Sequence, residues 1–530
     1  MTTPISTIDS GNALKKSITI ASVIMMGSVL LSRVIGMVRE MVLAHLLGTN
    51  AEMDAYVASF IIPELLNHLL AGGFLSITFI PIYQKYLISK DTKKSWEVFS
   101  NLLTIGSVFF AVLILVTMVF TNQIVGIMGH HISSGPERDL TVRLTRIIMP
   151  AQLLFYWGAF LMAVQYAHHR FLLPALAPLC YNLGIIVGGW FLYPYIGVEG
   201  FAWGVLIGAL IGNFALQVPG ALRTGLRYKF TFNLRDKDFI NYVLVTGPLI
   251  LGLGMSFSNE LFFRFFGSFL GTGGLASINY SLRTMMPLVG VFGQASGVAS
   301  YPFLSHLAVE KKFNEMNALL NSIVTKISTY LIPISSVMIV LSVQIIAILF
   351  EHGRFSHAST LATAPVLVLY LLGALPFAAS SIVMRNYYAM QNTLFPMIVC
   401  SVIALLSIPG YWILSKYFGA AGIACAASLA MLVQFVLLYG IWSKNHNNLK
   451  GIYKVLITMV KIICVSILGA GIAFGLKRYA MHIGITETTF VHNIILCFVS
   501  GVPALVVMFV ILERMHISST RMILARVFKR

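Results

Sequence analysis

Apolar runs long enough to cross a bilayer recur from one end of this chain to the other. A helix needs only about 20 such residues to span the hydrocarbon core. In lipid every backbone polar group must be paired internally, so these runs fold as helices. A membrane barrel would show short alternating strands instead, and the sequence lacks that pattern. The sequence therefore predicts an all-α integral membrane protein.

The composition supports this fold class. Apolar residues make up 58% of the 530 residues and charged residues 10%, whereas a soluble domain carries about 25% charged residues. The five cysteines lie inside apolar runs without metal-ligand spacing, and we expect neither a metal site nor disulfides. We expect about fourteen spans, with ends uncertain by several residues, at 18–48, 54–84, 97–122, 140–167, 172–193, 198–222, 238–268, 274–304, 314–348, 360–388, 394–416, 420–442, 453–476 and 488–512.

The net charge of +18 is concentrated in short loops, as the positive-inside rule requires of a membrane protein. This distribution argues against a nucleic-acid partner. Alternate connections differ in Lys and Arg content, and the richer set contains the loop at 85–94, the segment at 223–237 and both ends of the chain. The sequence therefore predicts a multi-pass protein of the bacterial inner membrane with both termini in the cytoplasm.

The two halves of the chain look related. Tyr166–Pro174 (YAHHRFLLP) aligns with Tyr388–Pro396 (YAMQNTLFP), and further short matches recur at a nearly constant separation. Two pseudo-repeated bundles of about six helices around a central cavity are a transporter architecture. We therefore expect an N-terminal tail (1–17), an N-lobe (18–222), a basic cytoplasmic linker (223–237), a C-lobe (238–442), two C-terminal helices (443–512) and a basic cytoplasmic tail (513–530).

The first predicted span contains three charged residues, Arg33, Arg39 and Glu40. A charge within a span costs about 2.5–3.5 kcal/mol on insertion scales, so it normally faces a cavity or a partner. Arg33 and Glu40 share a helix face. The excess of arginine over glutamate favours a cavity function, with snorkelling or a structural ion pair as the alternative.

Two further spans carry candidate residues. Arg283 is the only formal charge in its run, so it needs an acidic partner from another helix or an anionic ligand. Glu260 and Arg264 are spaced to pair within one helix, and this pairing and a cavity role remain equally open. The sequence has no GxxxxGK[ST] or HExxH motif and no recognisable catalytic set. We therefore expect a transporter that has no ATPase activity, no other enzymatic activity and no cofactor. The sequence does not identify a coupling ion.

The segment that begins SRVIGMVRE (Ser32–Glu40) and continues with GTNAEMDAYVASFIIPELLNHLLAGGFLSITFIPIY (Gly48–Tyr83) resembles the MurJ (MviN) family of lipid II flippases, in the MOP superfamily. Further matches are HHRFLLPALAPLCYN, SLRTMMPLVGV and LFEHGRFS. The resemblance implies two six-helix lobes around a cavity and a lipid-tail groove in 443–512.

The resemblance also implies roles for single residues. The family's cavity arginines correspond to Arg33, Arg39 and Arg283, and its acidic residues to Glu40 and Asp54. Where many members have two adjacent arginines, this chain has Asn67 and His68.

We therefore expect a flippase that moves lipid II, an undecaprenyl-pyrophosphate-linked disaccharide peptide, to the outer leaflet by alternating access. Arginine binds phosphate through a bidentate fork, which suits the pyrophosphate. Membrane lipids and the cell-wall synthesis machinery are the other expected partners. The alternatives are an exporter of another lipid-linked glycan, a MATE-like drug or cation antiporter, and a scaffold without transport. An antiporter for cations needs an acidic site, whereas the charges that we expect in the cavity are mostly basic.

Overall fold

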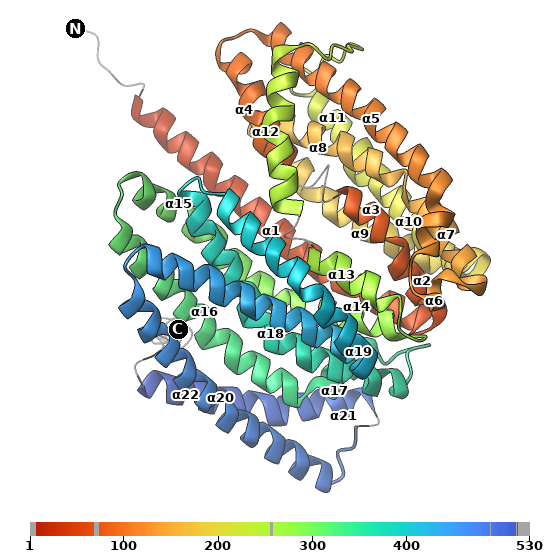
Figure 1. Cartoon of the computed structure of the whole chain (residues 1–530), viewed down its shortest axis with the longest axis vertical. Helices are drawn as coiled ribbons and strands as arrows, with labels where there is room; N and C mark the ends of the chain where they lie inside the picture. The colour runs from red at the N-terminus through yellow and green to blue at the C-terminus, as the bar shows by residue number, and fades with distance from the viewer. Residues whose placement is uncertain (1–6, 68–73, 255–257, 488, 516, 518–530) are drawn as a thin grey trace. The chain divides into compact units, whose positions relative to one another are not determined.

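The structure is a computed structural model that describes residues 7–67, 74–254, 258–487, 489–515 and 517. These residues form helices and connecting turns, with no strand among them (Figure 1). The chain divides into unit 1, residues 1–43 and 51–257, and unit 2, residues 44–50 and 258–530. His68 and Gly72–Gly73 lie outside the described residues.

Unit 1 contains most of α1 and the helices up to α12. The packing of α9 along α10 is the most extensive in this unit, and α4, α5 and α8 enclose an aromatic core that includes Phe79, Phe99 and Phe160. The bounds are α1 Thr7–Leu47, α2 Ala51–Ser59, α3 Ile61–Leu66, α4 Phe74–Ile88, α5 Thr92–Gly126, α6 His130–Ser133, α7 Gly135–Ile148, α8 Ala151–Ala167, α9 Leu172–Ile196, α10 Glu199–Ala209, η2 Leu210–Ala215, α11 Gln217–Leu222 and α12 Lys237–Gly254.

Unit 2 contains the remaining helices. In it α18 packs against both α14 and α19, while α20 lies against α16. The bounds are α13 Ser258–Gly267, α14 Gly274–Leu288, η4 Val289–Gln294, α15 Ala295–Val309, α16 Phe313–Val340, α17 Ser342–Phe350, α18 His357–Ala389, α19 Leu394–Asn445, α20 Leu449–His482, α21 Phe490–Leu496, η5 Cys497–Gly501 and α22 Val502–Arg514.

Nine helical stretches among the described residues are long and apolar enough to cross a membrane. One of them, α19, is two helices joined at Gly419, whose φ of 57° is not helical. This junction lies between the predicted spans 394–416 and 420–442. The all-α membrane fold predicted from the sequence is therefore confirmed, and the count of fourteen spans stays a prediction.

The last turn of α1 belongs to unit 2, where the motif LFEHGRFS (Leu349–Ser356) holds it. Arg354 N donates to His45 O at 2.9 Å, and Tyr280 Oη donates to Gly48 O at 3.0 Å. Gly48 has a φ of 64°, and a Cβ there would lie 2.5 Å from Arg354 O. A side chain at this position would therefore collide with the loop as well as strain the backbone.

The helix that follows the linker, α12, packs on α4 and α5 of unit 1. Thr246 Oγ1 donates to Thr78 Oγ1 at 3.2 Å, and Tyr86 Oη donates to Asp238 Oδ2 at 2.8 Å. Unit 1 therefore includes α12, whereas the predicted lobes, 18–222 and 238–442, assign this helix to the C-lobe. The lobes remain a prediction about the internal repeat.

Candidate functional site

Arg39 and Glu40 form a buried ion pair on α1 in unit 1. Arg39 Nη2 lies 2.5 Å from Glu40 Oε1, and the two side chains are 18% and 4% exposed. Adjacent helical residues do not normally face each other, so the length of the arginine side chain makes this contact. Within this part of the protein, Glu40 partly neutralises the charge of Arg39.

Asn182 on α9 completes this cluster, and sequence reasoning did not single it out. Its Oδ1 accepts from Arg39 Nη1 at 3.0 Å, and its Nδ2 donates to Pro178 O at 3.0 Å and to Ser32 Oγ at 3.4 Å. Asn182 is 8% exposed. The amide therefore fixes the direction of the Arg39 guanidinium from a second helix. A polar amide in the otherwise apolar run of α9 was the signal for it.

Arg33 and Asp54 are the other predicted site residues of unit 1. Arg33 is half-buried on α1, about 9 Å before Arg39 along the helix axis at the standard rise per residue. Asp54 is fully buried in the first turn of α2, where a helix N-terminus favours a negative charge.

Arg283 on α14 lies beside Glu260 on α13 in unit 2. Arg283 Nη1 is 3.9 Å from Glu260 Oε1, with the side chains 27% and 23% exposed. This distance is that of an ion pair rather than a hydrogen bond. Of the two possibilities left by the sequence for Arg283, an acidic neighbour from another helix is thus present.

Two more arginines lie within the predicted spans of unit 2. Arg264 is 3% exposed, and its guanidinium lies over the Phe263 ring at 5.4 Å, a cation–π contact. Arg385 on α18 was not singled out from the sequence; it is half-buried, and a Cβ on Gly297 would lie 2.6 Å from its Nε. Gly297 therefore provides the space that Arg385 occupies between α15 and α18.

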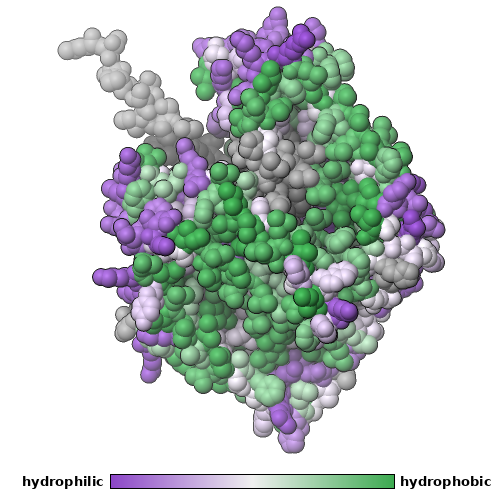
Figure 2. Space-filling model, viewed as in Figure 1, coloured by the Kyte–Doolittle hydropathy of each residue, from purple (hydrophilic) through white to green (hydrophobic). Residues whose placement is uncertain are grey.

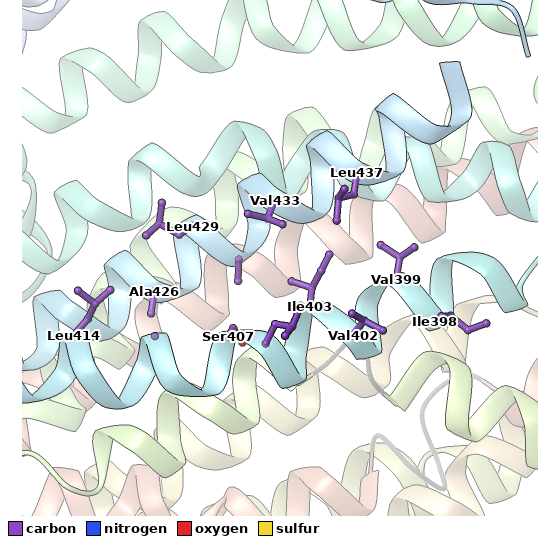
Figure 3. A pocket seen from close by; sticks show the side chains of 13 residues that line it. Ile398, Val399, Val402, Ile403, Ser407, Leu414, Ala426, Leu429, Val433 and Leu437 are labelled. Atoms are coloured by element: carbon purple, nitrogen blue, oxygen red, sulfur yellow. The ribbon is translucent and has the colours of Figure 1, made fainter. Parts of the chain in front are cut away.

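An open groove of about 340 Å³ runs between the two halves of α19 (Figure 3). Its walls are aliphatic, and residues such as Leu406, Val402 and Val433 are exposed. Ser407 is the exception, and its hydroxyl donates to Ala404 O at 2.7 Å. The groove presents hydrocarbon to its surroundings, so it suits a hydrocarbon chain and not a charged headgroup.

The chemistry available at these clusters is anion binding. Arginine keeps its charge in apolar surroundings and presents several donors in a planar fork that matches phosphate oxygens. The acidic neighbours stabilise the arginines when no anion is bound, because an isolated buried charge is strongly unfavourable.

Comparison with known proteins gives a consistent result. A family model described as "Lipid II flippase MurJ" matches residues 43–495. A probable lipid II flippase MurJ from Buchnera aphidicola subsp. Baizongia pistaciae is 26% identical over 412 residues, which cover 77% of this chain and 80% of that protein.

Solved structures agree on the fold. A lipid II flippase MurJ in an inward closed conformation matches with a TM-score of 0.77 and 23% identity, over 94% of this chain and 100% of that chain. An inward-facing multidrug resistance MATE family transporter of the MOP superfamily matches with a TM-score of 0.67 and 13% identity, over 79% of this chain and 95% of that chain. At these identities the likeness concerns the fold.

Proposed function

Because the chain belongs to the MurJ family of lipid II flippases, we propose that it carries lipid II from the cytoplasmic to the outer leaflet of the inner membrane. It is a multi-pass membrane transporter. In our proposal both termini lie in the cytoplasm, and transport proceeds by alternating access without ATP hydrolysis.

The observation that carries the proposal is the excess of arginine in apolar spans. Arg33, Arg39 and Arg283 are each partly withdrawn from solvent, and the carboxylates of Glu40 and Glu260 lie beside Arg39 and Arg283. A protein that only needed a stable fold would gain little from such charges, since replacing buried ion pairs by apolar residues is often neutral or stabilising.

We assign the three arginines to the pyrophosphate of lipid II. Asn182 and Glu40 hold the Arg39 guanidinium in a fixed direction, which reduces the ordering needed when the ligand arrives. Asp54 and Glu260 are supporting residues that balance charge around the arginines, and Arg264 is a supporting cation beside them. The prenyl tail stays in a hydrocarbon environment during transport.

Export of another lipid-linked glycan is the second candidate, because a pyrophosphate-linked glycan presents the same anion to the arginines. The family match favours lipid II. The MATE fold likeness does not favour a cation substrate, because several arginines near the ligand would repel it.

Variants test the assignment. Alanine at Arg33, Arg39 or Arg283 should abolish complementation in cells depleted of their flippase, with normal amounts of folded protein. Lysine at the same positions should restore part of the function, since it keeps the charge and loses the fork. Arg146→Ala is the matched control, because Arg146 is an exposed arginine at the end of α7. Full complementation by all three alanine variants would contradict the proposal.

A further inference from the structure

Residues 223–237 join α11 to α12 and include the first residue of α12. They combine cations and aromatic side chains at the surface of unit 1, and we name this segment the linker strap. Its five cations are all exposed, and it has one acid, Asp236. Three apolar side chains of the strap are unusually open, with Phe230 71% exposed, Leu234 53% and Phe232 49%. The cations are Arg223, Arg227, Lys229, Arg235 and Lys237.

Buried polar side chains of α5 fix the course of the strap. Asn101, 4% exposed, accepts from Asn233 N at 2.8 Å and donates to Asn233 O at 2.9 Å. Ser100 Oγ accepts from Lys229 N at 3.1 Å. Three hydrogen bonds from α5 thus hold the backbone of a segment that has no regular secondary structure of its own.

Side chains of the strap make further contacts. In its middle, Tyr228 Oη lies 2.9 Å from Thr104 Oγ1. At its C-terminal end, Lys94 Nζ lies 3.4 Å from Asp236 Oδ2, and Asp236 Oδ1 accepts from the backbone of Asp238 at 3.0 Å at the start of α12. The strap is therefore an ordered surface feature.

The apolar and the cationic side chains of the strap are exposed together. Phe230, Phe232 and Leu234 are open to the surroundings, and so are the interleaved cations Lys229 and Arg235. The strap therefore presents apolar and cationic side chains on the same surface segment.

The strap lies beside the start of the apolar surface of α5. It contacts α5 at Ser100, Asn101 and Thr104, and the first exposed apolar side chains of this span, Val108 and Phe109, follow about one turn later. Hydrophilic residues gather at this end of unit 1, where α4, α5 and α12 meet (Figure 2). Tyr and Trp concentrate at membrane interfaces, and Phe inserts into the headgroup boundary in interfacial segments, so we expect the interface at this end of α5.

We propose that the linker strap is a binding surface for anionic glycerophospholipids of the adjoining leaflet. Phe230 and Phe232 enter the headgroup layer, and the neighbouring cations contact lipid phosphates. The charge favours this partner, since juxtamembrane Lys and Arg residues are attracted to anionic lipid surfaces. The inference concerns a surface separate from the arginines assigned to lipid II and does not depend on what is transported.

Fluorescence in nanodiscs tests the proposal. In a cysteine-free background, Phe230→Cys carries an environment-sensitive fluorophore, and Thr92→Cys, at an exposed position at the start of α5 and about two turns before Ser100, is the matched control. Each is placed in phosphatidylcholine alone and in equal parts phosphatidylcholine and phosphatidylglycerol. We expect the label at 230 to be quenched severalfold more by spin-labelled lipid than by iodide, with stronger lipid quenching when phosphatidylglycerol is present. The label at 92 should favour iodide.

A second variant identifies the charges. Combined Arg227→Ala, Lys229→Ala and Arg235→Ala should remove the effect of phosphatidylglycerol at 230, and added salt should weaken it. Iodide quenching at 230 equal to that at 92 would overturn the proposal, as would identical lipid quenching in the two compositions. Phe232→Cys serves as the labelled site if Phe230→Cys does not fold. Because no readout involves transport, failure here is distinguishable from failure of the proposed function.

Discussion

Arg283 and Glu260 are neighbours across two helices, so their contribution to folding can be separated from anion binding. The exchange Arg283→Glu with Glu260→Arg keeps opposite charges at the 3.9 Å contact but moves the cation to α13. We expect the double variant to fold better than Arg283→Glu alone, because one like-charge contact is removed. We also expect it to lose export, since the cation no longer lies on α14.

Thermal unfolding reports how well these variants fold, and complementation of flippase-depleted cells by the same variants reports their export. Restored export in the exchanged protein would mean that the pair serves the fold alone.

Glu40 offers a second test at the residue scale. It is 3% exposed and lies 2.5 Å from Arg39, and removing one partner of such a buried pair costs about 3–5 kcal/mol. Glu40→Gln should therefore impair export more than Glu40→Asp, which keeps the charge. Complementation at matched expression measures this, and wild-type function in the glutamine variant would show that the charge of Glu40 is dispensable.

Charged residues were predictable from the sequence, whereas their partners were not. Arg33, Arg39 and Arg283 stand out because a charge in an apolar run is rare. Asn182 carries no charge, so its contact with Arg39 emerges only when α1 and α9 pack. Likewise, the contact of Arg283 with Glu260 requires α13 and α14 to meet, which residue spacing within one helix does not indicate.

At the scale of elements, the sequence predicted which segments are helical better than it predicted where the helices become irregular. Hydrophobicity indicates a span between 140 and 167, and the stretch 135–167 is one candidate span, interrupted only by an irregular turn at Met149–Pro150 whose residues keep helical φ and ψ. The predicted span 198–222 corresponds to the stretch 199–222, which contains the π-helical η2. Such irregularities depend on local hydrogen bonding and on neighbouring helices, which a hydropathy pattern does not contain.

The topology can be tested through the loops that join these elements. Lys90 lies between α4 and α5, and Glu137 lies near the start of α7, beyond the other end of α5. The positive-inside rule predicts that Lys90 faces the cytoplasm and Glu137 the outside. Single cysteines at these positions, in a cysteine-free background, should therefore react with a membrane-impermeant reagent from opposite sides. Equal labelling from outside would contradict the proposed orientation.

At the scale of the whole molecule, transport without ATP needs another source of free energy. Moving one charge through 100 mV is worth about 2.3 kcal/mol, so a diphosphate of charge about −2 would gain roughly 4–5 kcal/mol on leaving a negative interior. Roughly 5.5 kcal/mol shifts a two-state equilibrium from 1:99 to 99:1, so the potential is large enough to bias alternating access. The membrane potential has this effect only if the arginines do not move the same distance across the membrane as the ligand.

We therefore expect export to fall when an ionophore collapses the membrane potential while the pH gradient is held. The quantity to measure is the amount of lipid II that reaches the outer leaflet. A non-electrogenic exchanger, which leaves the membrane potential in place, is the control. Unchanged export would leave ion exchange or consumption of the product as the driving force.

The central claim, that this protein moves lipid II and uses its buried arginines to do so, is tested most directly by locating lipid II after depletion. Cells depleted of their flippase should accumulate lipid II in the inner leaflet. Expression of this protein should restore the outer-leaflet pool, whereas Arg39→Ala or Arg283→Ala at equal abundance should not. An outer-leaflet pool that is unaffected by the presence of the wild-type protein would contradict the claim.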